Sequence, residues 1–154
     1  MRLADVLRED CIITDLKARE KQGLLDEMVS DITSRVGSLD REKVLNALLE
    51  RERLGTTGIG HGVAIPHGKV KGLSEIKVFF GRSRKGVDFN SMDNLPVYLF
   101  FMIVVPENSA AAHLKILAVI SNLLKSQDFR TRLMRAETGS EIYRIITEAE
   151  RNSG

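Results

Sequence analysis

The chain has little that would suit an oxidising compartment or a membrane. Cys11 is its single cysteine, so no internal disulfide can form, which fits a reducing cytosol. The most apolar run, residues 97–105, has nine residues, about half of what a membrane helix requires. The first residues have neither the apolar h-region nor the cleavage site of a signal peptide. We therefore expect a soluble, cytoplasmic protein that does not insert into a membrane.

The chain also lacks an excess of charge of one sign. Its 23 basic and 21 acidic residues are interspersed and leave a formal charge of +2. This balance indicates neither a basic surface for nucleic acid nor a highly charged tail. The densest basic cluster, residues 82–85, is typical of an exposed turn. Because no repeat, low-complexity tract or linker divides it, we expect one domain over residues 1–154, with its core over about residues 3–150.

Apolar spacing and local stop signals predict the elements of this domain. Asp40 is a suitable N-cap for one helix, and Ser109 for another. Residues 96–105 are rich in Val and Phe, which indicates a strand covered on both faces at the centre of a sheet. Together the pattern predicts an α/β or α+β fold, a sheet flanked by helices, without determining strand order. The expected helices are residues 3–8, 18–36, 41–54, 110–125, 127–135 and 140–150; the expected strands are 11–13, 63–65, 76–81 and 96–105, with a turn and edge segment over 84–89.

Residues 51–69 are the most informative stretch. They hold five of the twelve glycines and two of the three histidines. Glycine lets another group approach the backbone closely, so this density predicts a tight loop around a contact point. Pro66 has no N–H to continue a ladder, which predicts that His67 stands where a strand gives way to a loop.

Two nucleotide-binding loops are excluded by spacing. A P-loop needs four residues between its glycine and its Gly-Lys pair, but five separate Gly62 from Gly68, and Val70 follows Lys69 where Ser or Thr would be required. The dinucleotide fingerprint would need a third glycine where Val63 stands. No bound nucleotide is indicated.

The same stretch resembles the active-site signature of mannitol/fructose-type enzyme IIA of the bacterial phosphotransferase system. The Thr-Thr-Gly-Ile-Gly sequence most resembles the nitrogen-regulatory branch of that family, and the similarity extends to about residue 150. The resemblance implies a mixed sheet with helices on both faces, and phosphorylation of His67 on its Nε2 nitrogen. The residues that carry it are Arg51-Glu52, Gly55-Thr56-Thr57, Gly58-Ile59-Gly60 and Gly62-Val63-Ala64-Ile65-Pro66-His67-Gly68.

Two histidines are the candidates for chemistry. Histidine suits phosphoryl transfer because its neutral imidazole is a nucleophile near pH 7 and the phosphoramidate stays reactive. For His67 the alternative is a structural histidine bonded to a loop carbonyl. His113 shares a helical stripe with Leu117 and Ile120, so it should point inward as a neutral ring. Its alternative is a core histidine; the resemblance implies that it orients or stabilises the phosphoryl group.

Phosphate contacts are expected from Arg51, Thr57, Gly60 and Gly68. The guanidinium of Arg51 matches phosphate oxygens bidentately, although a cation in the last turn of a helix also complements the helix dipole. Thr57 and the backbone N–H groups near Gly60 and Gly68 would add neutral donors.

Three further residues stay open. His61 is expected to be a loop residue near the site, although three histidines together would also suit zinc. Asp88 matches a position of the family and equally suits a turn. Ile59, with Val63 and Ile65, is expected to form an apolar docking rim.

The function predicted from these residues is that of a phosphocarrier. A phosphoprotein such as HPr would donate the group, and neither a metal nor another cofactor is expected. Two roles remain: regulation through phosphorylation-dependent binding to kinases, transporters or other targets, or sugar uptake by transfer to a separate IIB protein. Outside the family, the alternative is a metal- or ligand-binding domain. Nucleic acid is not an expected partner.

Overall fold

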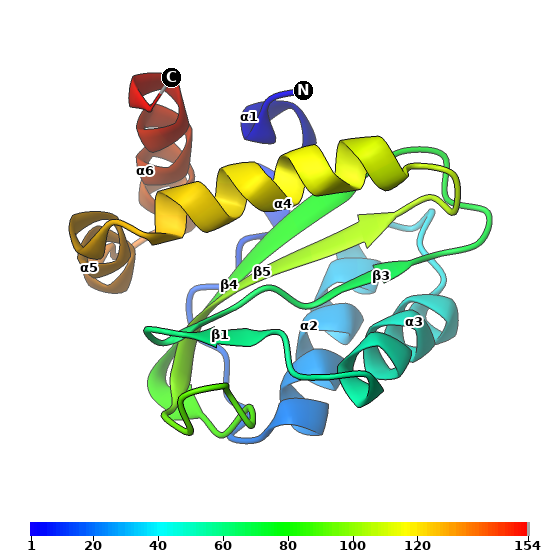
Figure 1. Ribbon diagram of the computed structural model, residues 1–154, viewed down its shortest axis with the longest axis horizontal. Helices are drawn as coiled ribbons and strands as arrows, with labels where there is room; N and C mark the ends of the chain where they lie inside the picture. The colour runs from blue at the N-terminus through cyan, green and yellow to red at the C-terminus, as the bar shows by residue number, and fades with distance from the viewer. Residues whose placement is uncertain (154) are drawn as a thin grey trace.

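A computed structural model describes residues 1–153 of the chain; Gly154, the last residue of the expected domain, lies outside this range. Helices surround a central sheet, as predicted, and both termini lie at the same side of the molecule (Figure 1). In chain order the elements are α1 (Leu3–Val6), a 3-10 turn η1 (Glu9–Cys11), α2 (Lys21–Arg35), α3 (Arg41–Arg53), β1 (Gly58–Gly60), β2 (Val63–Ala64), β3 (His67–Lys69), β4 (Lys77–Val87), β5 (Val97–Val105), α4 (Ala110–Leu124), α5 (Gln127–Arg135) and α6 (Gly139–Asn152).

Strand β5 is the centre of the sheet, which confirms the prediction from its apolar sequence. It pairs antiparallel with β4 along one edge and parallel with β2 and β3, while β1 is antiparallel to β2. Because β4 follows nearly the whole of one edge of β5, β2 and β3 must share the other edge. The sheet is therefore mixed and five-stranded.

Strands β2 and β3 lie end to end along β5, with the break at Pro66. Val63 and Ala64 align with Leu99 and Phe100, whereas His67 aligns with Ile103. The carbonyl of Pro66 still accepts a hydrogen bond from the N–H of Ile103, at 2.9 Å. His67 is consequently the first residue of a new strand. The prediction that it begins a loop was wrong, because the proline interrupts the ladder for only two residues.

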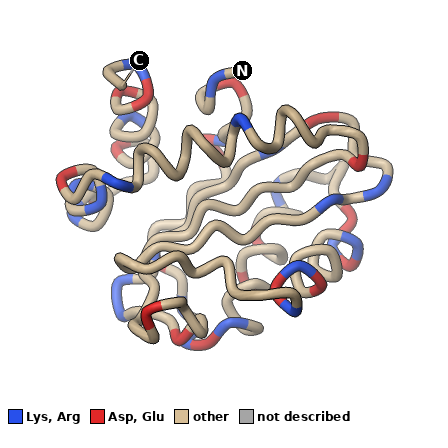
Figure 2. Tube along the Cα trace, in the orientation of Figure 1, with Lys and Arg blue, Asp and Glu red and all other residues tan. Residues whose placement is uncertain are grey.

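Two apolar layers cover the sheet. Residues alternate along β5, so Phe101 and Ile103 pack with α1, α4, α5 and α6, while Phe100 and Met102 pack with α2 and α3. This double coverage is why the β5 sequence is continuously apolar. The central strand β5 has no charged residue, and most acidic and basic residues lie around the periphery (Figure 2).

Some local predictions were wrong for identifiable reasons. Residues 11–13 form no strand, because Ile13 makes only an isolated bridge to Gly81. The segment expected to be a separate turn and edge, residues 84–89, largely continues β4, since the strand passes through an irregularity between Arg82 and Val87. Arg82 is fully buried and not in an exposed turn, because its guanidinium donates to the carbonyls of Thr14, Leu133, Met134 and Ala136.

The helices agree more closely with their apolar patterns. The Asp40 carboxylate caps α3 by accepting from the Lys43 N–H, as predicted. The C-terminal helix begins at Gly139, and its N-cap is Thr138. None of the helices within residues 1–153 is both long and apolar enough to cross a membrane.

Candidate functional site

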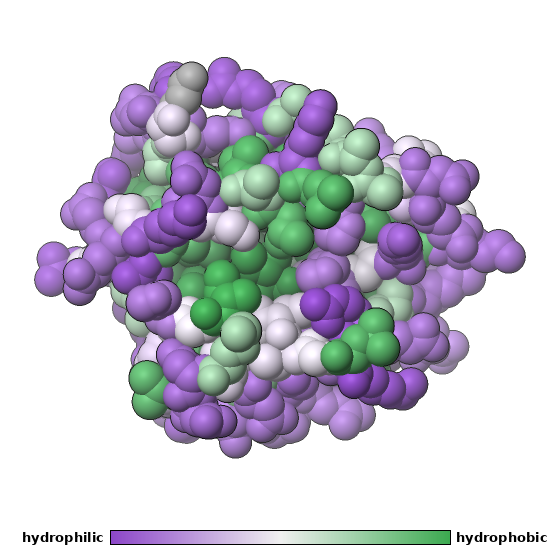
Figure 3. Space-filling view, viewed as in Figure 1, coloured by the Kyte–Doolittle hydropathy of each residue, from purple (hydrophilic) through white to green (hydrophobic). Residues whose placement is uncertain are grey.

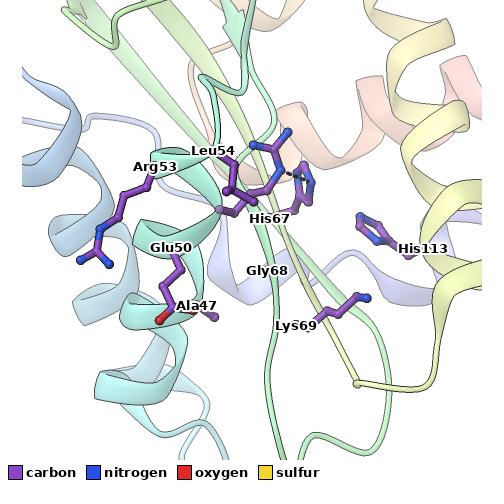
Figure 4. A pocket seen from close by; sticks show the side chains of 9 residues that line it. Ala47, Glu50, Arg53, Leu54, His67, Gly68, Lys69 and His113 are labelled. Atoms are coloured by element: carbon purple, nitrogen blue, oxygen red, sulfur yellow. Dashed lines mark hydrogen bonds between the residues drawn. The ribbon is translucent and has the colours of Figure 1, made fainter.

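A cavity of about 610 Å³ lies where α3 ends and where β3 and α4 begin. Figure 4 shows His67 and His113 on facing elements, with Lys69 extending on the side of His113 and Arg53 pointing away from His67. The two expected catalytic residues, His67 and His113, are 46 positions apart in sequence and both line this cavity. The cavity is lined by Ala47, Glu50, Arg51, Arg53, Leu54, His67, Gly68, Lys69 and His113.

Gly68 lets α3 lie directly against β3. A Cβ atom at this position would lie 2.9 Å from the backbone carbonyl carbon of Ala47 and 3.0 Å from its Cβ, closer than real Cβ atoms pack. The glycine was expected to supply a phosphate-binding N–H; its evident role here is close packing. This packing places the last turn of α3, and therefore Arg51, beside His67.

Hydrogen bonds determine which nitrogen of His67 carries the proton. Its Nδ1 lies 2.8 Å from the carbonyl oxygen of Ile65, which can only accept, so Nδ1 must donate. Its Nε2 accepts from the Nε–H of Arg51 at 3.2 Å. In the neutral ring Nε2 therefore holds the free electron pair, on the side that faces the cavity.

His113 lies beside this ring with unused hydrogen-bonding capacity. The two ring centroids are 5.0 Å apart and the ring planes are inclined by 60°. The Nε2 atom of His113 is buried and has no hydrogen-bond partner in residues 1–153. A buried polar atom without a partner is unfavourable, so a ligand in the cavity that bonded to it would be stabilised.

The site keeps both rings neutral. Burial lowers the pKa of His67 below its ordinary value of 6.5; the hydrogen bond to Ile65 opposes this effect, and the positive charge of Arg51 adds to it. Burial is also the main reason that the pKa of His113 is lowered, with smaller contributions from His67, Lys69 and Arg51. A neutral imidazole is the nucleophilic form.

Not all the predicted contact residues reach the cavity. The hydroxyl of Thr57 is buried and donates to Glu52, so it is not free for phosphate. Gly60 is the last residue of β1 and does not line the cavity. The expectation of phosphate donors at Thr57 and Gly60 is therefore corrected, because neither residue lines the cavity and the Thr57 hydroxyl is already bonded to Glu52.

His61 does not join the other two histidines. It is exposed in the turn between β1 and β2, with φ of 58°, and its N–H donates to Asp93. Within residues 1–153, no group of three His, Cys, Asp or Glu side chains is arranged to hold a metal ion. The zinc alternative thus has no support in this geometry. Asp88 accepts from the N–H of Asn90 and acts as a turn residue.

Lys69 was missed from the sequence, although a signal was present. Residues two apart on a strand share a face. Since His67 faces the cavity from β3, Lys69 does as well, whereas Gly68 faces α3. Arg51 and Lys69 lie beside the two neutral rings, and Arg53 and Glu50 also line the cavity, so cations outnumber acids there, which suits an anion.

The apolar surface near the site differs from the expected rim. Val63 and Ile65 are buried in the core, so of the three predicted rim residues only Ile59, 43% exposed, is available. Leu54 and Leu114 are 85% and 66% exposed. Figure 3 shows an apolar hollow on this face of the molecule.

Substitution of Gly68 tests the packing of α3 on β3. We expect Gly68→Ala to separate α3 from β3 and to lower the free energy of unfolding by about 1–3 kcal/mol, because the added methyl group overpacks the contact. Gly37→Ala is the matched control, since a Cβ at Gly37 has no atom within 4 Å. Urea denaturation would measure both; equal stabilities for the two variants would contradict the close contact.

The lowered histidine pKa values predict a pH dependence. The unfolded chain binds more protons than the folded protein near pH 6.5, so stability decreases as pH falls through 6.5 toward the folded-state values. NMR titration should place the midpoints of His67 and His113 below 6.5. Replacing both rings by Gln should weaken the loss of stability on this acid side, and midpoints at or above the ordinary value would contradict the assigned environment.

Comparison with known proteins places this geometry in a family. The family described as phosphoenolpyruvate-dependent sugar phosphotransferase system, EIIA 2, matches residues 5–149. A nitrogen regulatory protein of Bradyrhizobium diazoefficiens is 39% identical over 146 residues, covering 95% of each chain. The fructose-specific EIIA component of Haloferax volcanii is 40% identical over 129 residues, 83% of each chain.

A solved structure agrees in fold as well as in sequence. The crystal structure of nitrogen regulatory protein IIA-Ntr from Neisseria meningitidis is 33% identical, with a TM-score of 0.87 over 94% of this chain and 98% of that chain. The resemblance noted in the sequence is thereby confirmed. The chain belongs to the EIIA type 2 family of the phosphoenolpyruvate-dependent sugar phosphotransferase system.

Proposed function

We propose that this protein is a phosphocarrier that accepts a phosphoryl group on Nε2 of His67. The observation that carries the proposal is the pair of hydrogen bonds on that ring: Nδ1 donates to Ile65, which leaves the electron pair on Nε2 at the cavity. Membership of the EIIA family supports phosphoryl transfer as the reaction.

The transfer step follows from this tautomer. The electron pair of Nε2 forms a bond to phosphorus while the donor's nitrogen–phosphorus bond breaks, and its electron pair stays on the donor nitrogen. His67 keeps its Nδ1 proton, so its ring gains positive charge, which the Ile65 carbonyl oxygen stabilises. Arg51 must first release Nε2, since its Nε–H occupies the electron pair in the free protein.

The neighbouring groups would then hold the phosphoryl group. Released from Nε2, the guanidinium of Arg51 can donate to two phosphoryl oxygens. The partnerless Nε2 of His113 can donate an N–H to a third oxygen if its proton resides there, which satisfies a buried polar atom. Lys69 adds positive charge on the same side of the cavity.

The donor in this proposal is a protein of the HPr class. A phosphorylated protein residue can reach the ring because the cavity is open and its rim exposes Leu54, with Leu114 beside His113. Apolar residues around a polar centre are typical of a protein docking surface. Membership of the family supports two kinds of partner: a protein that donates the phosphoryl group, and a IIB domain or regulatory target that binds afterwards.

Phosphate labelling tests the carrier. With phosphoenolpyruvate, enzyme I and HPr, the wild type should be labelled, and His67→Ala should abolish labelling because the nucleophile is gone. Arg51→Ala and His113→Ala should slow it by about 10²-fold each, the effect of losing one group that stabilises transferring charge. His61→Ala is the matched control and should leave the rate unchanged. Persistent label on His67→Ala would refute the assignment.

Two roles remain open for the phosphorylated form, and the regulatory one is favoured. The relatives named nitrogen regulatory proteins align over nearly the whole chain, and phosphorylation converts a neutral ring into a dianionic group that can make or break an interface. The second candidate is sugar uptake with a separate IIB protein, favoured by the 40% identity to a fructose-specific EIIA component.

Capture experiments distinguish the two roles. If the protein regulates, His67→Ala and a phosphomimetic His67→Glu should retain different sets of partner proteins, because the two differ in charge at the docking face. If it serves uptake, purified phosphoprotein should instead transfer its label to a fructose-class IIB protein. Transfer to IIB together with identical partner sets for both variants would overturn the regulatory role.

A further inference from the structure

Glu52 is a buried acid next to Arg51 that the chemistry above does not use. It lies in the last turn of α3 and is only 8% exposed. Its carboxylate accepts from the N–H of Thr57 at 3.2 Å and from the Thr57 hydroxyl, and it pairs with the ammonium of Lys21 at 2.9 Å. A buried carboxylate is retained only where it is paired in this way, so its contacts report what it holds together.

These contacts join three separate segments. Lys21 is the first residue of α2, and its ammonium also lies 4.9 Å from the centre of the Phe89 ring. Thr57 comes immediately before β1. Glu52 thus ties the end of α3 to the start of α2 and to the chain that enters β1. The four residues between α3 and β1, 54–57, are thereby held at their far end.

The same four residues anchor Arg51. Its Nη1 donates to the carbonyl of Gly55 at 2.8 Å while its Nε donates to His67. The N–H of Gly55 in turn donates to the backbone carbonyl of Glu52 at 3.2 Å. The guanidinium is therefore held at two points, and one of them, Gly55, belongs to the turn that Glu52 fixes through Thr57.

We propose that Glu52 is a positioning residue for phosphoryl transfer: by holding residues 54–57 it keeps the Gly55 carbonyl where it can anchor Arg51 beside Nε2 of His67. This inference rests on the proposed function. The anchor matters most when Arg51 leaves Nε2, because the bond to Gly55 keeps the guanidinium within reach of the arriving group. The hydrogen bonds and ion pair of Glu52 go to Thr57 and Lys21 and to neither ring, so its positioning effect passes through Arg51.

A double-mutant cycle separates this role from a merely structural one. Glu52→Gln keeps the shape but replaces one acceptor oxygen by an NH₂ group that faces Thr57 or Lys21. We expect it to slow labelling by HPr about tenfold in the wild type, and by less than about twofold in an Arg51→Ala background, because the residue through which it acts is then absent. Asp31→Asn, which breaks an exposed ion pair on α2, is the matched control and should not change the rate.

A spectroscopic measurement accompanies the kinetics. In the free wild type, the Nε–H of Arg51 should exchange slowly with water because it is bonded to His67. In Glu52→Gln it should exchange as fast as an exposed arginine, while the helical content is unchanged. Slow exchange that persists in this variant would contradict the positioning role.

Removing one partner of a buried ion pair can also unfold a protein. Two further variants therefore control for loss of stability. Lys21→Met with Glu52→Gln leaves no unpaired buried charge, and Thr57→Val keeps the ion pair while removing the hydroxyl that links Glu52 to the turn. Each should slow labelling by about threefold or more, and each effect should vanish in the Arg51→Ala background.

The outcomes distinguish this inference from the function on which it rests. A wild type that stays unlabelled would refute the phosphocarrier itself. Two outcomes with a labelled wild type would leave the phosphocarrier intact and overturn the role of Glu52. In the first, none of these variants changes the labelling rate. In the second, each variant slows labelling by the same factor in the Arg51→Ala background as in the wild type.

Discussion

The hydrogen bond from Nδ1 of His67 to the Ile65 carbonyl is the interaction on which the site depends. Ile65 lies between β2 and β3, just before the proline that separates them, and its oxygen is available to a ring two residues later. A carbonyl oxygen accepts and never donates, so this contact selects one tautomer. It leaves Nε2 as the only nucleophilic nitrogen and aims it at the end of α3. A break in a strand has therefore become the means of orienting a reactive group.

Around this ring the fold combines neutral nucleophiles with fixed cations. Burial is the main reason that protonation of both rings is disfavoured; Arg51 adds to this effect at both rings and Lys69 at His113, so both rings stay neutral. The same cations attract a phosphoryl group. The same two cations thus help to keep the rings neutral before transfer and stabilise the phosphoryl group after it. Two acids lie near these cations: Glu50 lines the cavity, and the buried Glu52 is paired with Lys21. The charge of Glu52 opposes the lowering of the His67 pKa without reversing it.

Glycines and prolines act here through backbone geometry. Gly68 permits an approach between α3 and β3 that any side chain would prevent. Because close packing of this kind requires glycine, a glycine-rich stretch predicts that another segment lies close to the backbone. It does not reveal which segment that is. Thr57 and Gly60 belong to the same stretch, yet Thr57 is bonded to Glu52 before β1, Gly60 ends β1, and neither lines the cavity at His67. Residues close in a motif can therefore have different tasks.

The sequence alone determined most elements, the place of β5, the family and the two histidines. It did so because apolar periodicity reports burial directly, and because the motif around His67 is local in the chain. It could not predict the irregular continuation of β4, the inward course of Arg82 or the outward face of Leu114, which depend on packing between distant segments. Only the tertiary structure decided which groups meet His67. Arg51, Lys69 and His113 come from three elements, and their meeting depends on the register of β3 on β5 and on the absence of a Cβ at Gly68.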